Sequence, residues 1–236
     1  MKSFNIDEIK EYYDKAEEIW PESDVWHIKT NRVIDNFLKK LNWSPNTYVL
    51  NAGSGGNEYS LPYNFHHVDI SDNHMEGVKN FTIANIEKLP FNNCTFDHCI
   101  CVGSVLNYCD AMAAISELSR VIKEKGELVL EFENSWSYRY KKTPGYGVSA
   151  GVITIEFRDS SHTQLIYSEE HIISLCSKFG FEIIEKKRYH IISALALMYS
   201  GDEKKSAKYI CFDKLAGLIP FFSKHGNNIV FRLKKK

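Results

Sequence analysis

The sequence lacks two features that would point directly to a function: paired zinc-binding cysteines and a long apolar run. Its six cysteines contain no C-x-x-C pair, so the sequence predicts no metal site. No run of about 18 apolar residues occurs, which predicts no membrane span. Cys99 and Cys101 alternate along an apolar stretch, where cysteine packs as a small hydrophobic residue.

The sequence also lacks an excess of charge of either sign. Its 29 lysines and arginines face 30 acidic residues, for a net charge of −1. Nucleic-acid-binding proteins usually carry a basic surface, so nucleic acid is not an expected partner. The first residues lack the apolar core of a signal peptide, and unpaired cysteines suit the reducing cytosol. These observations predict a cytoplasmic protein that is a monomer or a homodimer.

The stretch around which the chain is organised is a strand followed by a glycine turn. Thr47–Leu50 has the apolar pattern of a buried strand, and Gly53, Gly55 and Gly56 follow it closely. Glycines at such a position allow a sharp bend or a close contact with a ligand. A strand, a glycine turn and a helix start would leave free backbone N–H groups directed at that ligand.

Two phosphate-binding loops fit this stretch poorly. The third glycine of G-x-G-x-x-G falls at Glu58, and the lysine of a P-loop is absent. A glutamate would repel a pyrophosphate, so the loop suits a ligand with little negative charge nearby. S-adenosylmethionine has a zwitterionic amino acid, a sulfonium and an uncharged ribose, and it meets this condition. An ordinary strand-to-helix turn explains the loop alone equally well.

Four motifs occur in one order between residues 47 and 135. They are Val49-Leu50-Asn51-Ala52-Gly53-Ser54-Gly55, then Asp69 after a second strand, then Asn85-Ile86-Glu87-Lys88-Leu89-Pro90-Phe91, then Phe96-Asp97-His98-Cys99. Together they resemble the class I S-adenosylmethionine-dependent methyltransferases. That family typically has V-L-D-x-G-x-G, an acid after the second strand, D-A-x-x-L-P-F and F-D-x-V at these places.

The chain departs from the family pattern at several positions. Asn51 and Asn85 stand where the family usually has Asp, although the amide of Asn85 can still accept a hydrogen bond from the adenine amino group. The span from Gly56 to Val68 is short, so the first crossover helix is expected to be truncated, with Pro62 ending it.

The resemblance implies an α/β fold of one domain over residues 1–236. We expect a Rossmann-like three-layer sandwich with a mostly parallel seven-stranded sheet and an antiparallel last strand. Residues 1–45 have the spacing of two helices, which would cap the cofactor, and 46–133 would form the cofactor-binding core. Residues 134–167 predict an inserted β-hairpin that acts as a lid, and 168–236 complete the sheet. The apolar stretch Ile219–Phe222 could meet a lipid or a partner, and packing on that sheet is the expected alternative.

The resemblance also assigns roles to individual residues. The backbone at Gly53–Gly55 would hold the amino acid part of S-adenosylmethionine, Asp69 the ribose, and Asn85 with Ile86 the adenine. The full set of predicted cofactor-binding residues is Asn51, Gly53, Ser54, Gly55, Asp69, Ile70, Asn85, Ile86, Val102, Ser104 and Tyr13.

The predicted reaction is methyl transfer to a small-molecule acceptor. Nucleic-acid amino-methyltransferases carry [DN]-P-P-[YF] after the fourth strand, and this chain has no Pro-Pro there. If the acceptor must lose a proton, His190, Tyr108 and Glu133 are candidate bases. Two other interpretations stay open: a non-catalytic protein of this fold that acts through a partner, and a nicotinamide-dependent oxidoreductase.

Overall fold

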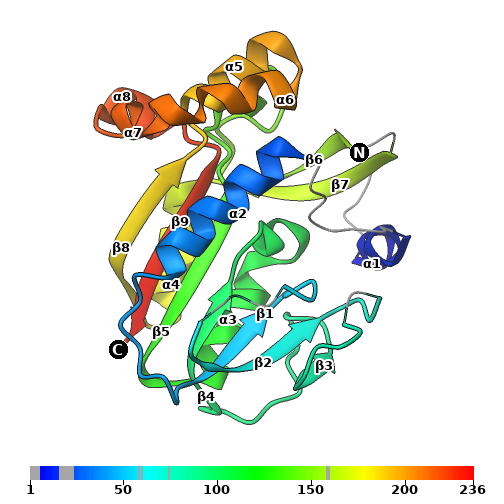
Figure 1. Cartoon of the computed structure of the whole chain (residues 1–236), viewed down its shortest axis with the longest axis vertical. Helices are drawn as coiled ribbons and strands as arrows, with labels where there is room; N and C mark the ends of the chain where they lie inside the picture. Colours follow the sequence, from blue (N-terminus) through cyan, green and yellow to red (C-terminus); the bar gives the residue numbers. More distant parts are fainter. Residues whose placement is uncertain (1–5, 16–23, 58, 60, 74, 158–159) are drawn as a thin grey trace.

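The structure is a computed structural model that describes residues 6–15, 24–57, 59, 61–73, 75–157 and 160–236 (Figure 1). Within these ranges one sheet has seven strands, namely β1 (Tyr48–Ala52), β2 (Asn64–Asp69), β3 (Phe81–Ile83), β4 (Phe96–Cys101), β5 (Ile122–Glu133), β8 (Phe181–Tyr189) and β9 (Asn228–Lys235). A separate hairpin consists of β6 (Ala150–Phe157) and β7 (Ser160–Tyr167). The helices are α1 (Ile6–Lys15), α2 (Val25–Leu38), α3 (Ala111–Val121), α4 (Glu169–Lys178), α5 (Ile192–Ser200), α6 (Glu203–Ser206), α7 (Asp213–Ala216) and α8 (Pro220–Ser223), with short 3₁₀ helices η1 (Val105–Tyr108), η2 (Tyr138–Tyr140) and η3 (Ala207–Phe212).

The strand order is β3-β2-β1-β4-β5-β9-β8. β9 pairs antiparallel with both of its neighbours, and the other pairs are parallel. The predicted mostly parallel sheet with an antiparallel last strand is therefore confirmed. The order reverses at β1 and β4, where the carboxyl ends of neighbouring strands diverge and leave a crevice.

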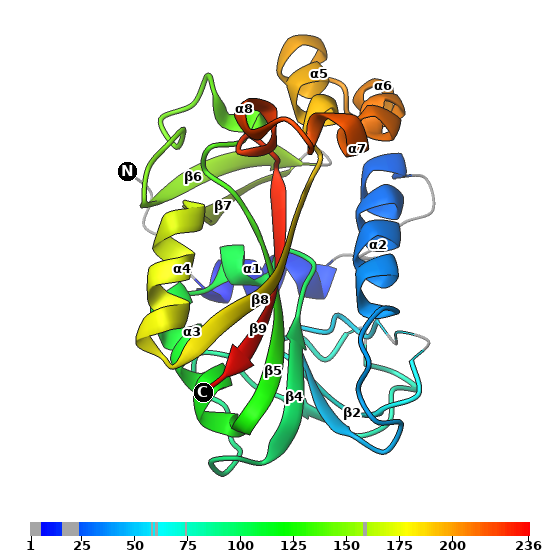
Figure 2. The same ribbon diagram turned by 90° about the vertical axis from the view of Figure 1, so that its left-hand side faces the viewer.

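Helices cover both faces of the sheet, as Figure 2 shows, and they form the predicted three layers. α3 and α4 bury Ile115 and Ile172 against the face that carries Leu50. α2 buries Ile34 against the opposite face, which carries Val49. Because successive side chains of a strand point to opposite faces, Val49 and Leu50 belong to different cores.

The helical crossovers differ from the expectation in the first half of the sheet. Between β1 and β2, the described residues form turns and no helix. The predicted truncation has thus gone further, and turns also make the connections from β2 to β4 within the described part of the chain. Glu58 lies outside the described residues. Without a crossover helix, the loop after β1 must be held by its own contacts.

The two amino-terminal helices have different positions. α2 packs on the sheet through Phe37 and Leu38, so the prediction that both helices cap the cofactor is wrong for α2. α1 lies near the crevice, with Ile9 buried. Ala16–Trp20, which the helical spacing of residues 1–45 includes, lie outside the described residues.

The carboxyl-terminal part confirms the predicted hairpin. Ser168 Oγ accepts a hydrogen bond from His171 N at 3.2 Å and caps α4. β8 ends at Tyr189, because His190 has a left-handed backbone with φ of 53° that turns the chain.

Helices α5 to α8 then form a lobe at the end of the molecule opposite β2 and β3 (Figures 1 and 2). In the described part of the chain, no helix is both long and apolar enough to cross a bilayer.

Candidate active site

The loop after β1 is fixed by hydrogen bonds within the protein. Gly53 N and Ser54 N both donate to Val68 O, at 2.8 and 3.1 Å. Gly55 N donates to Asp69 Oδ2 at 2.7 Å. The prediction that these N–H groups are free to bind a ligand is therefore wrong. They fix the shape of the loop instead, in the place of the missing crossover helix.

Gly53 is required by both conformation and space. Its φ is 70°, a left-handed value that glycine adopts without strain. A Cβ atom at this position would lie 2.4 Å from Val105 Cγ1. The loop after β4 therefore packs directly against the backbone of the loop after β1, and together they form the base of the crevice.

Asp69 ends β2 beside this loop. Its Oδ2 accepts from Gly55 N, and its Oδ1 accepts from Ser71 N at 3.1 Å. These two backbone N–H groups orient the Asp69 carboxylate beside the glycine loop.

A cavity of about 750 Å³, counted with its open mouth, lies above these loops. The volume is typical of a cofactor site. Among the described residues that line it, none is lysine or arginine, and Asp69 is the charged one. The lining residues are Ile6, Ile9, Tyr13, Gly53, Ser54, Gly55, Tyr59, Asp69, Ile70, Ala84, Asn85, Ile86, Val102, Gly103, Val105, Tyr108 and Cys109.

One group of lining residues is apolar apart from one amide. Ile70, Ala84 and Ile86 line the cavity with Asn85. Asn85 Oδ1 accepts from Glu87 N at 2.8 Å, which fixes the amide and leaves Oδ1 one further lone pair. The apolar side chains can cover the two faces of an aromatic ring, and the amide can bind its edge.

α1 closes one side of the cavity with Ile6, Ile9 and Tyr13. Its last turn is attached to the loop after β2, because Ser71 Oγ donates to Asp14 Oδ1 at 2.5 Å. Ser71 also donates its backbone N–H to Asp69. The helix over the cavity and the carboxylate at its floor are thus joined through one residue.

We compared the sequence with models of known protein families. The model of the methyltransferase domain family matches residues 50–130, from β1 to within β5. This segment contains the glycine loop, Asp69, Asn85 and the loop after β4. This part of the chain is therefore similar to S-adenosylmethionine-dependent methyltransferase domains. The family's cofactor is the ligand that the glycine loop and Asp69 led us to expect.

Two relatives of this methyltransferase domain are uncharacterized proteins of Methanocaldococcus jannaschii. One is 30% identical over 56% of the chain and 54% of its own length. The other is 33% identical over 54% of the chain and 61% of its own length. The matches therefore span little more than half the length of these relatives.

A solved structure with the same fold is geranyl diphosphate C-methyltransferase from Streptomyces coelicolor A3(2), in complex with Mg²⁺, geranyl diphosphate and S-adenosyl-L-homocysteine. Its TM-score with the methyltransferase domain is 0.63, at 12% identity, over 98% of each chain. At this identity the likeness establishes the fold alone.

The structure brings most of the predicted cofactor residues together at the cavity. Those that line it are Gly53, Ser54, Gly55, Asp69, Ile70, Asn85, Ile86, Val102 and Tyr13. Asn51 and Ser104 are not among the lining residues. The buried Asn51 side chain donates a hydrogen bond to Asn57 O at 3.0 Å, which helps to fix the end of the glycine loop.

The three candidate bases are in three different places. Tyr108 lines the cavity, and its ring meets that of Tyr13 edge-on at 5.7 Å. Glu133 is outside the lining, where its carboxylate accepts hydrogen bonds from Tyr140 and, at 3.4 Å, from Ser104 Oγ. His190 packs against α2 and is not among the lining residues.

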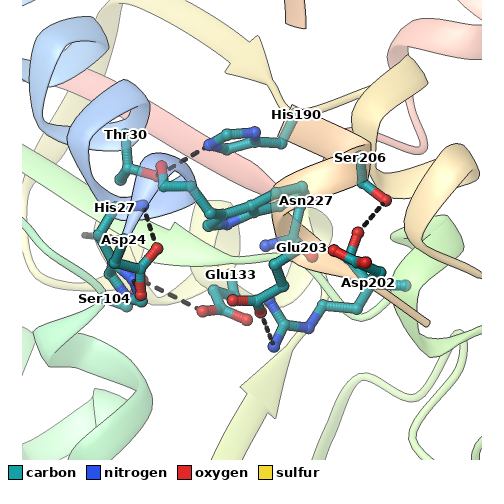
Figure 3. Close-up of polar contacts among 12 residues, drawn as sticks. Asp24, His27, Thr30, Ser104, Glu133, His190, Asp202, Glu203, Ser206 and Asn227 are labelled. Carbon is teal, nitrogen blue, oxygen red and sulfur yellow. Dashed lines mark hydrogen bonds and ion pairs between the residues drawn. The ribbon is translucent and has the colours of Figure 1, made fainter. Parts of the chain in front are cut away.

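His190 is fully enclosed between α2 and the chain after β8 (Figure 3). Its ring stacks on Trp26 with centroids 4.0 Å apart, and Nε2 forms a 2.8 Å hydrogen bond with Thr30 Oγ1. Burial, together with the positive charge of Arg139 and His27, lowers the pKa of His190 to about 3. The ring is thus neutral and away from the cavity, which suits a structural role.

Glu131 is a site residue that the sequence did not suggest. It is buried in the centre of β5, and its Oε2 accepts from Gly103 N at 2.9 Å and Ser104 N at 2.6 Å. Tyr189 and Asn228 donate to Oε1 at 3.0 and 2.6 Å. Burial raises the pKa of Glu131, and these four donors oppose that rise. A single acid within an apolar strand was the signal available in the sequence.

A second polar cluster borders Tyr108 and was also missed. Arg139 pairs with Glu203 at 3.1 Å, and Figure 3 shows Glu203 on the same side as Glu133. Burial opposes the charge on Arg139, but Tyr140, Glu133 and Glu203 outweigh burial and raise its pKa. Arg139 lies in the insertion and Glu203 in α6. No local sequence pattern indicates that these two segments come close to Glu133.

Proposed function

We propose that the chain transfers a methyl group from S-adenosylmethionine to a small organic molecule. The observation that carries this proposal is the cavity in which the oriented carboxylate of Asp69, the glycine loop and the Asn85 amide meet. The absence of lysine and arginine from its described lining supports a ligand without phosphates and disfavours a dinucleotide.

Each part of the cavity would hold one part of the cofactor. Asp69 would accept hydrogen bonds from the ribose hydroxyls, and Ile70 with Ile86 would cover the adenine faces. The loop at Gly53–Gly55 would border the amino acid part. When bound, S-adenosylmethionine supplies a methyl group on a sulfonium, which is already a good leaving group.

The acceptor would bind at the end of the cavity next to the loop after β4. Tyr108 is the candidate base that lines this region, and it would contact the acceptor directly. Glu133 and Arg139 lie near Tyr108 but outside the described lining of the cavity. Proximity and exclusion of water by α1 would supply much of the rate acceleration.

Isothermal titration with S-adenosylhomocysteine tests the proposal. We expect Asp69→Ala to weaken binding at least tenfold, because hydrogen bonds to a charged group contribute roughly 1.5–3 kcal/mol each. The matched control is Asp72→Ala, which removes an exposed acid from the same loop outside the cavity lining and should change affinity less than twofold.

Transfer itself is measured with methyl-labelled S-adenosylmethionine and a metabolite extract. Label should accumulate in the fraction below about 3 kDa with the unaltered protein and not with Asp69→Ala. A protein that fails to bind S-adenosylhomocysteine at millimolar concentration, or an Asp69→Ala variant that binds normally, would contradict the proposal. Binding without transfer would favour the non-catalytic interpretation.

A further inference from the structure

The lobe of α5 to α8 carries an exposed apolar stripe, which contradicts the expectation that Ile219–Phe222 packs on the sheet. Phe222 contributes to a small core, but Ile219 and Phe221 are 49% and 64% exposed. The stripe recurs at every third residue through η3, α7 and α8. Its members are Tyr209, Phe212, Leu215, Leu218 and Phe221.

Side chains that point inward from η3, α7 and α8 also recur at every third residue. Ala207, Asp213 and Ala216 are buried, and Ile210 packs against the core of Trp26. Side chains three residues apart eclipse one another in a 3₁₀ helix such as η3. The inward stripe therefore anchors the segment, and the apolar stripe beside it is left facing outward.

The polar residues of this lobe are mainly lysines. Residues 199–224 contain five lysines and three acids, an excess of two positive charges in a chain whose net charge is −1. The lysines are Lys204, Lys205, Lys208, Lys214 and Lys224.

The three acids of the lobe are already engaged. Glu203 pairs with Arg139, and Asp202 with Lys205 at 3.2 Å. Asp213 is buried and accepts from Ile192 N at 2.8 Å. Lysine charge therefore dominates the outward surface around the apolar stripe.

Exposed aromatic rings lie directly beside lysine side chains at two points of the lobe. Lys224 Nζ is 5.7 Å from the ring centre of Phe221. Lys142 Nζ is 5.8 Å from that of Tyr199, which is 77% exposed. Such neighbours allow the ring to enter an apolar phase while the ammonium group stays at its polar boundary.

We propose that this lobe docks the protein on an anionic lipid surface. A helical face with aromatic and leucine side chains, flanked by lysines, is typical of segments that lie in the membrane interface. A second copy fits less well, because a two-fold contact would place the same lysine-rich surface against itself. The lobe forms one end of the molecule (Figures 1 and 2), so a planar surface can reach it without contacting β1 to β3.

Co-sedimentation with lipid vesicles tests the proposal. We expect the protein to pellet with vesicles of 70% phosphatidylcholine and 30% phosphatidylglycerol, and to pellet far less with phosphatidylcholine alone or at high salt. Leu218→Glu/Phe221→Glu should weaken binding more than tenfold. Lys208→Gln/Lys214→Gln should weaken it by roughly fivefold for each lysine.

Matched controls lie elsewhere on the surface. Met112→Glu changes a side chain that is 49% exposed on α3, and Lys79→Gln removes an exposed lysine; both should bind like the unaltered protein. Circular dichroism melts confirm the fold of every variant, and the lysine variant leaves the apolar packing intact.

Absence of binding to anionic vesicles would overturn the proposal, and so would equal binding by all variants. A dimer in sedimentation velocity that Leu218→Glu/Phe221→Glu dissociates, without vesicle binding, would assign the surface to self-association.

Discussion

His190 shows how a single buried side chain can couple stability to pH. Its pKa is lowered from 6.5 to about 3 in the folded chain, by burial first and by nearby positive charges second. Between these two pH values the unfolded chain binds a proton at this residue and the folded chain does not. Its neutral ring therefore stabilises the fold fully above pH 6.5, and that contribution decreases as the pH falls towards 3.

We expect His190→Asn to remove this dependence. Asparagine tolerates the left-handed backbone at position 190 but does not titrate. The difference in unfolding free energy between the unaltered protein and the variant should be constant above pH 6.5. It should shrink below that by at most about 1.4 kcal/mol per pH unit. Urea unfolding at a series of pH values measures it, and a difference independent of pH would contradict this role.

Residues of local motifs could be predicted from the sequence, and residues placed by distant packing could not. Asp69 is the last residue of its strand, so its position at the carboxyl edge depended only on recognising that strand. His190 was expected at the same edge, but one left-handed residue turned it towards α2, about 160 positions earlier in the chain. Glu133 and Arg139 depend in the same way on how the insertion folds back.

At the scale of elements, the glycine loop replaces a missing crossover helix. Gly53 combines a left-handed backbone with a contact that excludes a Cβ atom, whereas Gly180, with φ of 83°, has nothing within 4 Å of that position. We expect Gly180→Ala to cost about 1–2 kcal/mol, from its backbone conformation alone. Gly53→Ala should cost about 1–3 kcal/mol more, because it also overpacks Val105.

The double variant Gly53→Ala/Val105→Ala separates the two effects. Removing the Val105 methyl groups should restore part of the stability that Gly53→Ala loses, while the cost of the left-handed backbone stays. Chemical denaturation of the four proteins measures these free energies in a double-mutant cycle. Strictly additive losses would show that the two loops are not in steric contact.

Element type followed the sequence pattern more closely than element position did. The caps at Asp110 and Ser168 and the alternation of the hairpin are local signals, and the structure has all three. The described residues between β1 and β4 form no helix, which was only partly foreseen because the short spacing indicated a truncated helix. A helix that caps a cofactor and a helix that covers a sheet have the same amphipathic pattern. The residues of α2 alone therefore could not show whether it packs on the cofactor or on the sheet.

At the scale of the whole molecule, α1 forms one side of the cavity wall. A helix of ten residues is marginal in water by itself, and α1 contributes Ile6, Ile9 and Tyr13 to the cavity wall. A bound cofactor would complete its apolar contacts. We expect S-adenosylhomocysteine to slow amide exchange in α1 at least tenfold, and to leave exchange in the central part of α3 nearly unchanged.

Hydrogen–deuterium exchange with mass spectrometry, with and without ligand, measures this change. Asp72→Ala should preserve the protection of α1, and Asp69→Ala should abolish it at the same ligand concentration. Protection that is equal in α1 and α3 would indicate global stabilisation by mass action and not closure of one helix over the site.

The four hydrogen bonds to Glu131 also bear on when the site can form during synthesis. Two of the donors, Tyr189 and Asn228, belong to β8 and β9, and β9 leaves the ribosome after the other strands of this sheet although it inserts beside β5. Until both strands have emerged, the carboxylate that orients the Gly103–Ser104 turn lacks half of these four donors. The nascent chain can therefore build the strands around the glycine loop early, but it orients this turn fully only after β9 has been translated.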